Sequence, residues 1–491
     1  MSTPAFDQLM AFQRETEALS RVAGRLSWDQ ETVMPRRAGD QRAEEQGAME
    51  AVLHARRTDP RVGTWLETAV ASDNEGSAQL RLIARDYARS VKVPVDLATA
   101  LARLTSRSQG IWADARANND VAAFLPTLEE VVALKREEAA AVADGRDLYD
   151  TMIDDYEPGA TAAGLAAIFD EMRPRLVALR ERALAAPVAP ALTGLFPEEA
   201  QLALSSELAK CFGYDFDRGR IDKAVHPFSS GSGLDVRITT RTEANDPFNC
   251  VYSTIHEVGH ATYEQNIDAA LLLTPAGQGV SMGVHESQSR IYENQLGRSR
   301  AFCGWLFNRM RDRFGDVGVA DADGFYRTVN RVHRGFIRTE ADEVQYNLHI
   351  MLRFDLERAL IAGDLSVRDL EAAWNDRFDS DFGYPVDQPA NGILQDVHWS
   401  VGLFGYFPTY ALGNVYAGCL HEALRRDLPD LDDALAQGDP SPALSWLREH
   451  LQRHGGVMEP ATLIEQACDA KASAEPLMTY LEEKFSAIIP G

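Results

Sequence analysis

The segment VYSTIHEVGHATYEQN, residues 251–266, contains two histidines four positions apart and a glutamate directly after the first. If the segment is a helix, His256 and His260 lie one turn apart on the same face, so both imidazoles can reach one metal ion. Glu257 then lies about 100° around the helix, close enough to take a proton from a water molecule on that ion. This HExxH pattern predicts a metal site that activates water. The alternative is an ordinary helix whose histidines pack in the core or face solvent.

A catalytic metal site of this kind needs a third protein ligand and an open fourth position. Glu286, in GVHESQSRIYEN, follows His260 by 26 residues, which is enough chain for a loop and a return on a second helix. Glu264 is the other candidate, although its side chain lies a further turn along the first helix. Two histidines and one glutamate form the ligand set of zinc peptidases, in which the ion activates water against a peptide carbonyl.

A ferritin-like di-iron centre is a rival metal site, because EVGH is also an ExxH sequence. That centre needs a second ExxH from another helix. None of the remaining nine histidines has a glutamate three positions before it. The residue inventory therefore favours a zinc hydrolase.

Helical periodicity dominates the chain on both sides of this motif. Residues 1 to about 200 are rich in Ala, Leu, Glu and Arg, with apolar residues at every third or fourth position in many segments. Asp246 as N-cap and Pro247 at the first helical position can start the helix that carries the histidines. Further on, apolar residues recur at i, i+4, i+7, i+8 and i+12, which predicts a core-facing stripe. These residues are Val344, Leu348, Met351, Leu352 and Leu356.

The middle of the chain predicts a small β-sheet. Residues 226–247 contain few helix formers, and VRITTR (236–241) has the β-branched alternation of a strand. The Gly-rich segment PAGQGVSMGVHES (275–287) is expected to pair with it. The sequence therefore predicts a mainly α-helical protein with one small sheet near residues 235–285. We expect one catalytic unit over residues 1–491, with a helical N-terminal part (about 1–200), a motif-bearing core that lines a cleft (about 226–410) and a helical C-terminal part (about 411–491).

Composition argues against several classes of partner. The chain of 491 residues has 49 Lys and Arg against 74 Asp and Glu, a net charge of −25, so neither nucleic acid nor an anionic membrane is expected to bind. The first residues lack the basic start and apolar core of a secretory signal, and no apolar run approaches the ~18 residues of a membrane helix. The five cysteines are scattered and never form CxxC, which indicates reduced thiols. We therefore expect a cytoplasmic protein.

Several separated motifs, taken together with HExxH, resemble the carboxypeptidase Taq family of metallocarboxypeptidases. They occur in the family's order and are HPF (226–228), DVRIT (235–239), HEVGH (256–260), HESQ (285–288), IRTEADE (337–343) and GILQDVHW (392–399). WDQETVMP (28–35) and YDTMIDDYEPG (149–159) are also similar to family segments. The resemblance therefore covers nearly the whole chain.

The resemblance implies a single, mostly helical, gluzincin-like architecture with a deep cleft and the small sheet near the metal site. It also implies a homodimeric enzyme that uses Zn²⁺, or Co²⁺, to remove C-terminal amino acids from peptides with broad specificity. The family's metal ligands fall on His256, His260 and Glu286, and its general base falls on Glu257. These are the four residues that the pattern of side chains also favours.

A carboxypeptidase must bind the free carboxylate of its substrate and stabilise an oxyanion. A guanidinium binds a carboxylate through two parallel hydrogen bonds; Arg338 in IRTEADE is the first candidate and Arg237 in DVRIT the second. Either arginine could instead form a structural ion pair. The oxyanion donor is expected to be His398 or Tyr410, although Tyr410 could equally be a core tyrosine. His226 in HPF could line the substrate subsites or serve packing.

Other polar residues near these motifs leave alternatives open. Asp342 and Glu343 could accept hydrogen bonds from the ligand histidines, as carboxylates commonly do at zinc sites, and His285 is assigned no role. The nearest alternative function is a zinc endo-oligopeptidase on a similar helical scaffold, which would share the ligands and the base but cut internally. A non-catalytic helical scaffold or peptide-binding protein would lack the base or the third ligand, and Glu257 and Glu286 are both present.

Overall fold

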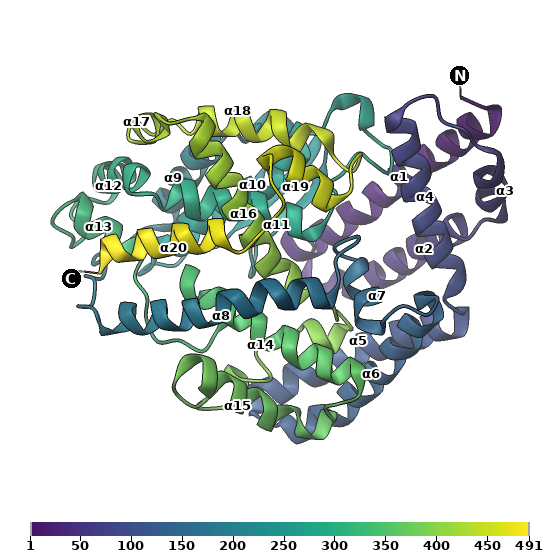
Figure 1. Cartoon of the computed structure of the whole chain (residues 1–491), viewed down its shortest axis with the longest axis horizontal. Coiled ribbons are helices and arrows are strands. Elements are labelled where there is room, and N and C mark those ends of the chain that lie inside the picture. Colours follow the sequence, from purple (N-terminus) through teal and green to yellow (C-terminus); the bar gives the residue numbers. More distant parts are fainter. Residues whose placement is uncertain (1, 490–491) are drawn as a thin grey trace. The chain divides into compact units, whose positions relative to one another are not determined.

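In the computed structural model, residues 2–489 are described and form a mainly helical protein with one three-stranded sheet (Figure 1). The predicted fold class is therefore confirmed. Among these residues, no helix is both long and apolar enough to cross a membrane. The five cysteines are free thiols, and four of them are buried.

The described residues divide into two compact units, each assembled from three segments of the chain. The first unit takes its residues from Met1–Val91, Ala189–Val329 and Cys419–Lys471, and the second from Lys92–Val188, Asn330–Gly418 and Ala472–Gly491. Helix α16 (Phe407–Asp427) begins in the second unit and ends in the first. Contacts between segments that are distant in sequence therefore define each unit.

The first unit contains the HExxH segment and the sheet. Its helices are α1 (Pro4–Thr32), α2 (Gly39–Arg57), α3 (Pro60–Thr68), α4 (Asn74–Lys92), α9 (Glu198–Cys211), α10 (Pro247–Asn266), α11 (Met282–Arg290), α12 (Arg300–Phe314), α13 (Ala322–Val329), α17 (Leu431–Leu435), α18 (Ser441–His450) and α19 (Pro460–Cys468). Helix α10 packs against α9, α11 and the sheet, and 14 of its 20 residues are buried. This helix is therefore the core of the unit as well as the carrier of the histidines.

The start of α10 agrees with the prediction. The Asp246 side chain accepts a hydrogen bond from the Phe248 N–H at 3.0 Å, and Pro247 occupies the first turn. Both features stabilise a helix start, because the cap satisfies one free N–H and proline has none to lose.

The sheet was predicted only in part. The predicted strand is present as β3 (Asp235–Thr240), but its partners are β1 (Ile221–Lys223), which runs parallel, and β2 (Ser229–Ser232), which runs antiparallel. The predicted pairing with residues 275–287 is wrong, because the second half of that segment begins α11, with Ser281 as its N-cap. A two-residue turn joins β2 to β3, and its first residue, Gly233, has φ +67°. Glycine at this position favours the tight local hairpin over a distant partner.

The second unit is helical throughout its described regular structure. Its helices are α5 (Val95–Asn118), α6 (Val121–Ala143), α7 (Leu148–Asp154), α8 (Ala162–Ala185), α14 (Glu343–Ala362), α15 (Leu370–Phe382) and α20 (Glu475–Ile488). Helices α5 and α6 pack along each other as a hairpin (Figure 1). The predicted apolar stripe lies on α14, and its five members are all buried, which confirms that prediction.

Helices α10 and α11 of the first unit approach each other at backbone distance. A Cβ built on Gly259 of α10 would lie 2.6 Å from the Gln288 carbonyl oxygen and 2.6 Å from the Ser289 Cα, both on α11. Side chains larger than hydrogen do not fit at such a contact. The glycine inside HEVGH therefore allows α11 to lie directly against the helix that carries both histidines.

Gly259→Ala is expected to lower the free energy of unfolding of the metal-free protein by about 1–3 kcal/mol, the usual cost of overpacking a core. It should also weaken metal binding, because α11 must move away from α10. Urea denaturation and metal titration measure the two effects. Gly304→Ala on α12 is the matched control, since its built Cβ meets nothing within 4 Å, and it should stabilise the protein slightly. Equal stability of the Gly259→Ala variant and the wild type would contradict the role of this contact.

Candidate active site

Three side chains of the first unit converge as potential metal ligands. His256 and His260 project from α10 and Glu286 from α11, and one candidate ligand atom from each lies within 4.8 Å of the others. The Glu286 Oε2 lies 3.9 Å from the His256 Nε2 and 3.5 Å from the His260 Nε2. Glu286 is 6% exposed. Two imidazole nitrogens and a carboxylate oxygen at this spacing can face one ion.

The carboxylate of Glu286 is held ionised by its neighbours. Burial alone would raise the pKa of Glu286, but the guanidinium of Arg290 outweighs it and holds the pKa well below its usual range. Arg290 lies one helical turn after Glu286, and its Nε donates to the Glu286 Oε1 at 2.7 Å. The other carboxylate oxygen remains directed at the two histidines.

Glu293 orients the first histidine. The π-helical turn Ile291–Gly297 continues α11, and it brings the Glu293 Oε2 to 2.9 Å from the His256 Nδ1. Arg298 donates to the other oxygen of Glu293 at 2.9 Å. A carboxylate can only accept, so His256 carries its proton on Nδ1 and keeps the Nε2 lone pair for a metal. The sequence interpretation missed Glu293, although it stands seven residues after Glu286, about two helical turns away.

A histidine and a second carboxylate orient His260. The His260 Nδ1 lies 2.6 Å from the His285 Nδ1, and the His285 Nε2 lies 3.0 Å from the Glu264 Oε1. Because Glu264 accepts from the His285 Nε2–H, the His285 Nδ1 accepts in turn from the His260 Nδ1–H. The Nε2 of His260 is then left with its lone pair towards Glu286. Burial lowers the pKa of His260 to about 3, which agrees with a neutral ring.

These contacts change two of the expectations. Glu264, the alternative third ligand, lies outside the group of converging ligand atoms and instead ends the hydrogen-bond chain from His260. His285, which was assigned no role, is the link in that chain. The signal in the sequence was its position directly before Glu286, which brings both side chains onto the same turn of α11.

Glu257 is buried beside the ligand histidines. It is 6% exposed, and burial raises its pKa to about 7, to which the nearby carboxylates of Glu286 and Glu293 also contribute. A carboxyl group with a pKa near neutrality can both accept a proton and return it.

Arg338 of the second unit belongs to a buried cluster with one carboxylate and a second arginine. The Arg338 Nε donates to the Asp396 Oδ1 at 3.0 Å, and the Arg353 Nε donates to the Asp396 Oδ2 at 2.7 Å. Arg338 is 6% exposed and Arg353 is fully buried. The pKa of Asp396 is held well below its usual range because the two guanidiniums outweigh the effect of burial. Two positive charges against one negative leave the cluster with an excess positive charge.

The hydrogen bonds of Arg338 leave room for a further anion. A guanidinium has five N–H donors. Nε and one N–H of Nη2 face Asp396, and one N–H of Nη1 donates to the Tyr346 hydroxyl at 3.2 Å. One N–H remains on each terminal nitrogen, and two N–H groups of a guanidinium can bind a carboxylate together.

His398 and Tyr410 lie together in the second unit. The His398 Nε2 is 3.4 Å from the Tyr410 hydroxyl, and the Arg338 guanidinium lies 5.1 Å from the centre of the Tyr410 ring. The structure therefore brings both oxyanion candidates and the first carboxylate candidate into one neighbourhood. Burial lowers the pKa of His398 to about 4.

The remaining candidates have other partners. The Arg237 Nε donates to the Asp235 Oδ1 at 2.7 Å, and its guanidinium lies 4.4 Å from the centre of the Trp28 ring. His226 is exposed. Asp342 caps the start of α14 by accepting from two backbone N–H groups, and Glu343 pairs with Lys484 of α20. These contacts give Asp342 and Glu343 structural roles in place of the suggested contact with the ligand histidines.

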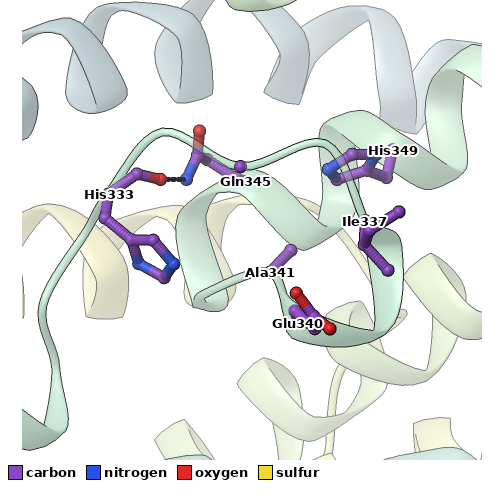
Figure 2. Close-up of a pocket in the computed structure, with 7 residues that line it drawn as sticks. His333, Ile337, Glu340, Ala341, Gln345 and His349 are labelled. Atoms are coloured by element: carbon purple, nitrogen blue, oxygen red, sulfur yellow. Dashed lines mark hydrogen bonds between the residues drawn. The ribbon is translucent and has the colours of Figure 1, made fainter. Parts of the chain in front are cut away.

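The segment that carries Arg338 encloses a small pocket of about 20 Å³ (Figure 2). The pocket is lined by His333, Gly335, Ile337, Glu340, Ala341, Gln345 and His349. The Gln345 Nε2 donates to the His333 carbonyl oxygen at 2.7 Å and ties the segment to α14. This volume suits one water molecule, so the pocket is too small for an amino acid side chain of a substrate.

Comparisons with known proteins match nearly the whole chain. The family model described as carboxypeptidase Taq (M32) metallopeptidase matches residues 8–485. The chain is 39% identical to thermostable carboxypeptidase 1 of Thermus thermophilus over 504 residues, covering 99% of each, and 34% identical to carboxypeptidase 1 of Bacillus subtilis, covering 98% of this chain and 97% of that protein.

Solved structures are similar over the same length. The crystal structure of an M32 carboxypeptidase from Deinococcus radiodurans has a TM-score of 0.95 and 37% identity, covering 99% of each chain. Metallocarboxypeptidase 1 of Trypanosoma cruzi has a TM-score of 0.93 and 33% identity, covering 98% of this chain and 99% of that one.

Glu293→Gln is expected to weaken metal binding by about 10- to 100-fold, the usual effect of losing a carboxylate that orients a ligand histidine. Competition with a chromogenic chelator measures the affinity. Asp342→Asn, which makes the same chemical change at a helix cap, should keep wild-type affinity. If both variants bind metal as the wild type does, Glu293 does not orient His256.

Proposed function

Because the chain belongs to the carboxypeptidase Taq (M32) family of metallopeptidases, we propose how its own residues carry out the reaction of a metal-dependent carboxypeptidase. The activity itself, metal-dependent hydrolysis of peptides at the C-terminus, follows from the family and from relatives of nearly the same length. The single observation that carries the proposed mechanism is the convergence of His256, His260 and Glu286.

These three residues are proposed to hold the ion. Their donor set suits it: each histidine has its Nδ1 occupied by a hydrogen bond, and Glu286 is ionised. A divalent ion bound here would lower the pKa of a water molecule and polarise the substrate carbonyl. We propose Zn²⁺ as the ion, with Co²⁺ as an alternative, because two imidazoles and one carboxylate form a familiar zinc ligand set.

Glu257 is the proposed general base. It follows His256 on α10, so its carboxylate lies beside the ligands without being one of the three that converge. It would take the proton from the attacking water and then deliver it to the nitrogen of the leaving amino acid. Its burial supports this role, because a carboxylate poorly solvated by bulk water holds a proton more readily.

Arg338 is the proposed receptor for the C-terminal carboxylate of the peptide. The excess positive charge of its cluster and the two N–H groups that remain on its terminal nitrogens support this assignment. Asp396 would hold the guanidinium in place, so that little side-chain freedom is lost when the peptide binds.

His398 and Tyr410 are proposed as donors to the substrate carbonyl oxygen as negative charge develops on it. Their mutual distance of 3.4 Å supports a shared role. His226 and Arg237 stay predictions as further substrate contacts, and the ion pair of Arg237 with Asp235 favours a structural role for that residue.

We further propose that the substrates are peptides with a free C-terminus and varied terminal residues, and that residues 1–491 serve one catalytic unit with a peptide-binding cleft. The acidic net charge supports the absence of a nucleic acid partner. A cytosolic location is supported by five free cysteines. The proposal of a homodimer depends on the family resemblance alone, and light scattering tests it.

Product mass from N-blocked peptides tests the function. With added Zn²⁺ or Co²⁺, single amino acids should leave one at a time from the C-terminus, and chelator should abolish their release. Glu257→Gln should retain the metal and lose turnover by about 10²- to 10⁴-fold, the usual contribution of a general base, whereas Glu286→Ala should lose the metal itself.

Internal fragments as first products would support the endo-oligopeptidase alternative instead. A metal-replete Glu257→Gln variant with full activity would remove the base assignment. Unchanged metal content of Glu286→Ala after dialysis against chelator would remove Glu286 as a ligand.

Arg338→Ala is expected to raise KM for free peptides by about 10- to 100-fold, because a hydrogen bond to a charged group contributes about 1.5–3 kcal/mol. C-terminally amidated peptides should be poor substrates of the wild type, and the variant should lose this preference for the free acid. Arg237→Ala is the control, and a larger rise in KM there would move the carboxylate receptor to Arg237. Steady-state kinetics with matched acid and amide peptides decides between them.

A further inference from the structure

Glu357 is a buried acid of the second unit to which the proposed mechanism gives no role. It lies on α14 and is fully buried. Its Oε1 accepts from the Trp399 Nε1–H at 2.7 Å, and its Oε2 accepts from the Tyr149 hydroxyl at 2.7 Å and from the Gly405 N–H at 3.0 Å. A buried carboxylate is costly unless such donors surround it.

The donors to Glu357 stand at both ends of one short connection. Trp399 directly follows His398 in the 3-10 turn His398–Val401, and Gly405 lies two residues before α16, which carries Tyr410. Glu357 therefore fixes both ends of the segment that joins the two proposed carbonyl-oxygen donors. Their contact of 3.4 Å depends on the shape of this segment.

The same face of α14 also binds Asp396, which precedes His398 in the chain. Arg353, one helical turn before Glu357, donates to the Asp396 carboxylate. The stretch from residue 396 to residue 405 is thus attached to one helix at three points, through Asp396, Trp399 and Gly405.

Helix α7 supports the other side of the connection. Gly405 has φ +78°, and a Cβ built there would lie 2.7 Å from the Ile153 nitrogen and 2.7 Å from the Met152 carbonyl carbon. Tyr149, at the start of α7, supplies the third donor to Glu357. The segment YDTMIDDYEPG (149–159), to which the proposed reaction assigns no role, packs against the connection at Gly405.

Only an acid suits this position. A glutamine has one acceptor oxygen, and in either orientation its amide nitrogen would face an N–H donor, that of Trp399 or that of Gly405. An apolar side chain would leave three buried donors without an acceptor, at a cost in stability.

We infer that Glu357 is a positioning residue that sets the position of His398 beside Tyr410 through the segment 399–405. The inference rests on the role proposed above for His398. It goes beyond that role, because it assigns a function to a side chain that lies one layer behind the groups that face the substrate.

A double-mutant cycle tests the inference in the full-length, metal-replete enzyme. The variants are Glu357→Gln, His398→Ala and the pair together, with Glu129→Gln on the exposed surface of α6 as a control for the lost charge. The measurements are kcat, KM, metal content and Tm. Glu357→Gln should lower kcat by up to about 100-fold, the effect of misplacing a reacting group by about 1 Å, while KM, metal content and the control stay close to wild type.

The cycle separates positioning from general stability. If Glu357 acts through His398, the double variant should be no slower than His398→Ala alone, because the two losses are not additive. Multiplied losses, or wild-type kcat in Glu357→Gln, would overturn the inference. Wild-type kcat in His398→Ala would instead overturn the role proposed for His398, and with it the route assigned to Glu357.

Tyr149→Phe keeps the cycle usable if Glu357→Gln does not fold. It removes one donor to Glu357 and keeps the packing of the ring. It should lower kcat by less than Glu357→Gln, and this loss should also vanish in the His398→Ala background. A loss that persists there would show that the contacts do not act through His398 and would overturn the inference.

Discussion

The close contact between α10 and α11 at Gly259 is the constraint on which the metal site depends. Two histidines one turn apart can face an ion from a single helix, but the third ligand has to come from another element. With a hydrogen atom as the side chain of residue 259, the backbone of α11 lies against α10, and Glu286 reaches within 3.5 Å of His260. The glycine of HEVGH is thus part of the site, although it has no group that reacts.

Buried charge in both units is matched by buried partners. In the first unit, Arg290 pairs with both Glu286 and Glu293, Arg298 pairs with Glu293, and Glu293 accepts from His256. In the second unit, Asp396 accepts hydrogen bonds from two arginines, and Glu357 accepts hydrogen bonds from three neutral donors. Each of these groups would be costly alone, because burial disfavours the charged form. The partners of Glu286, Glu293 and Asp396 outweigh that cost, whereas at Glu357 burial still raises the pKa to about 7. In each case the contacts fix the side chain, so that the groups proposed to act on substrate have little freedom to move.

The sequence predicted what depends on local periodicity and on fixed chemical spacing. The helical fold, the cap of α10 and the apolar stripe of α14 follow from positions close together in the chain, and so do the spacing of His256 and His260 and the presence of a later glutamate. Contacts between residues far apart in the chain could not be predicted in this way. Strand β3 pairs with its hairpin neighbour β2 and not with the Gly-rich residues 275–287, because the turn at Gly233 makes the local pairing compact. The partners of His256 and His260 were missed because Glu293 and His285 acquire their roles only when α11 lies against α10.

The π-helical turn at Ile291–Gly297 carries a consequence for how this region can vary. A turn of this kind holds an additional residue within an otherwise regular helix, and Glu293 lies inside it. Removal of one residue between Glu286 and Glu293 would restore ordinary α-helical pitch and rotate every later side chain by about 100°. The orienting carboxylate would then face away from His256 even though no residue type had been lost. In this segment the length of the chain is itself a functional property, so variants that tolerate substitutions here should still not tolerate insertions or deletions.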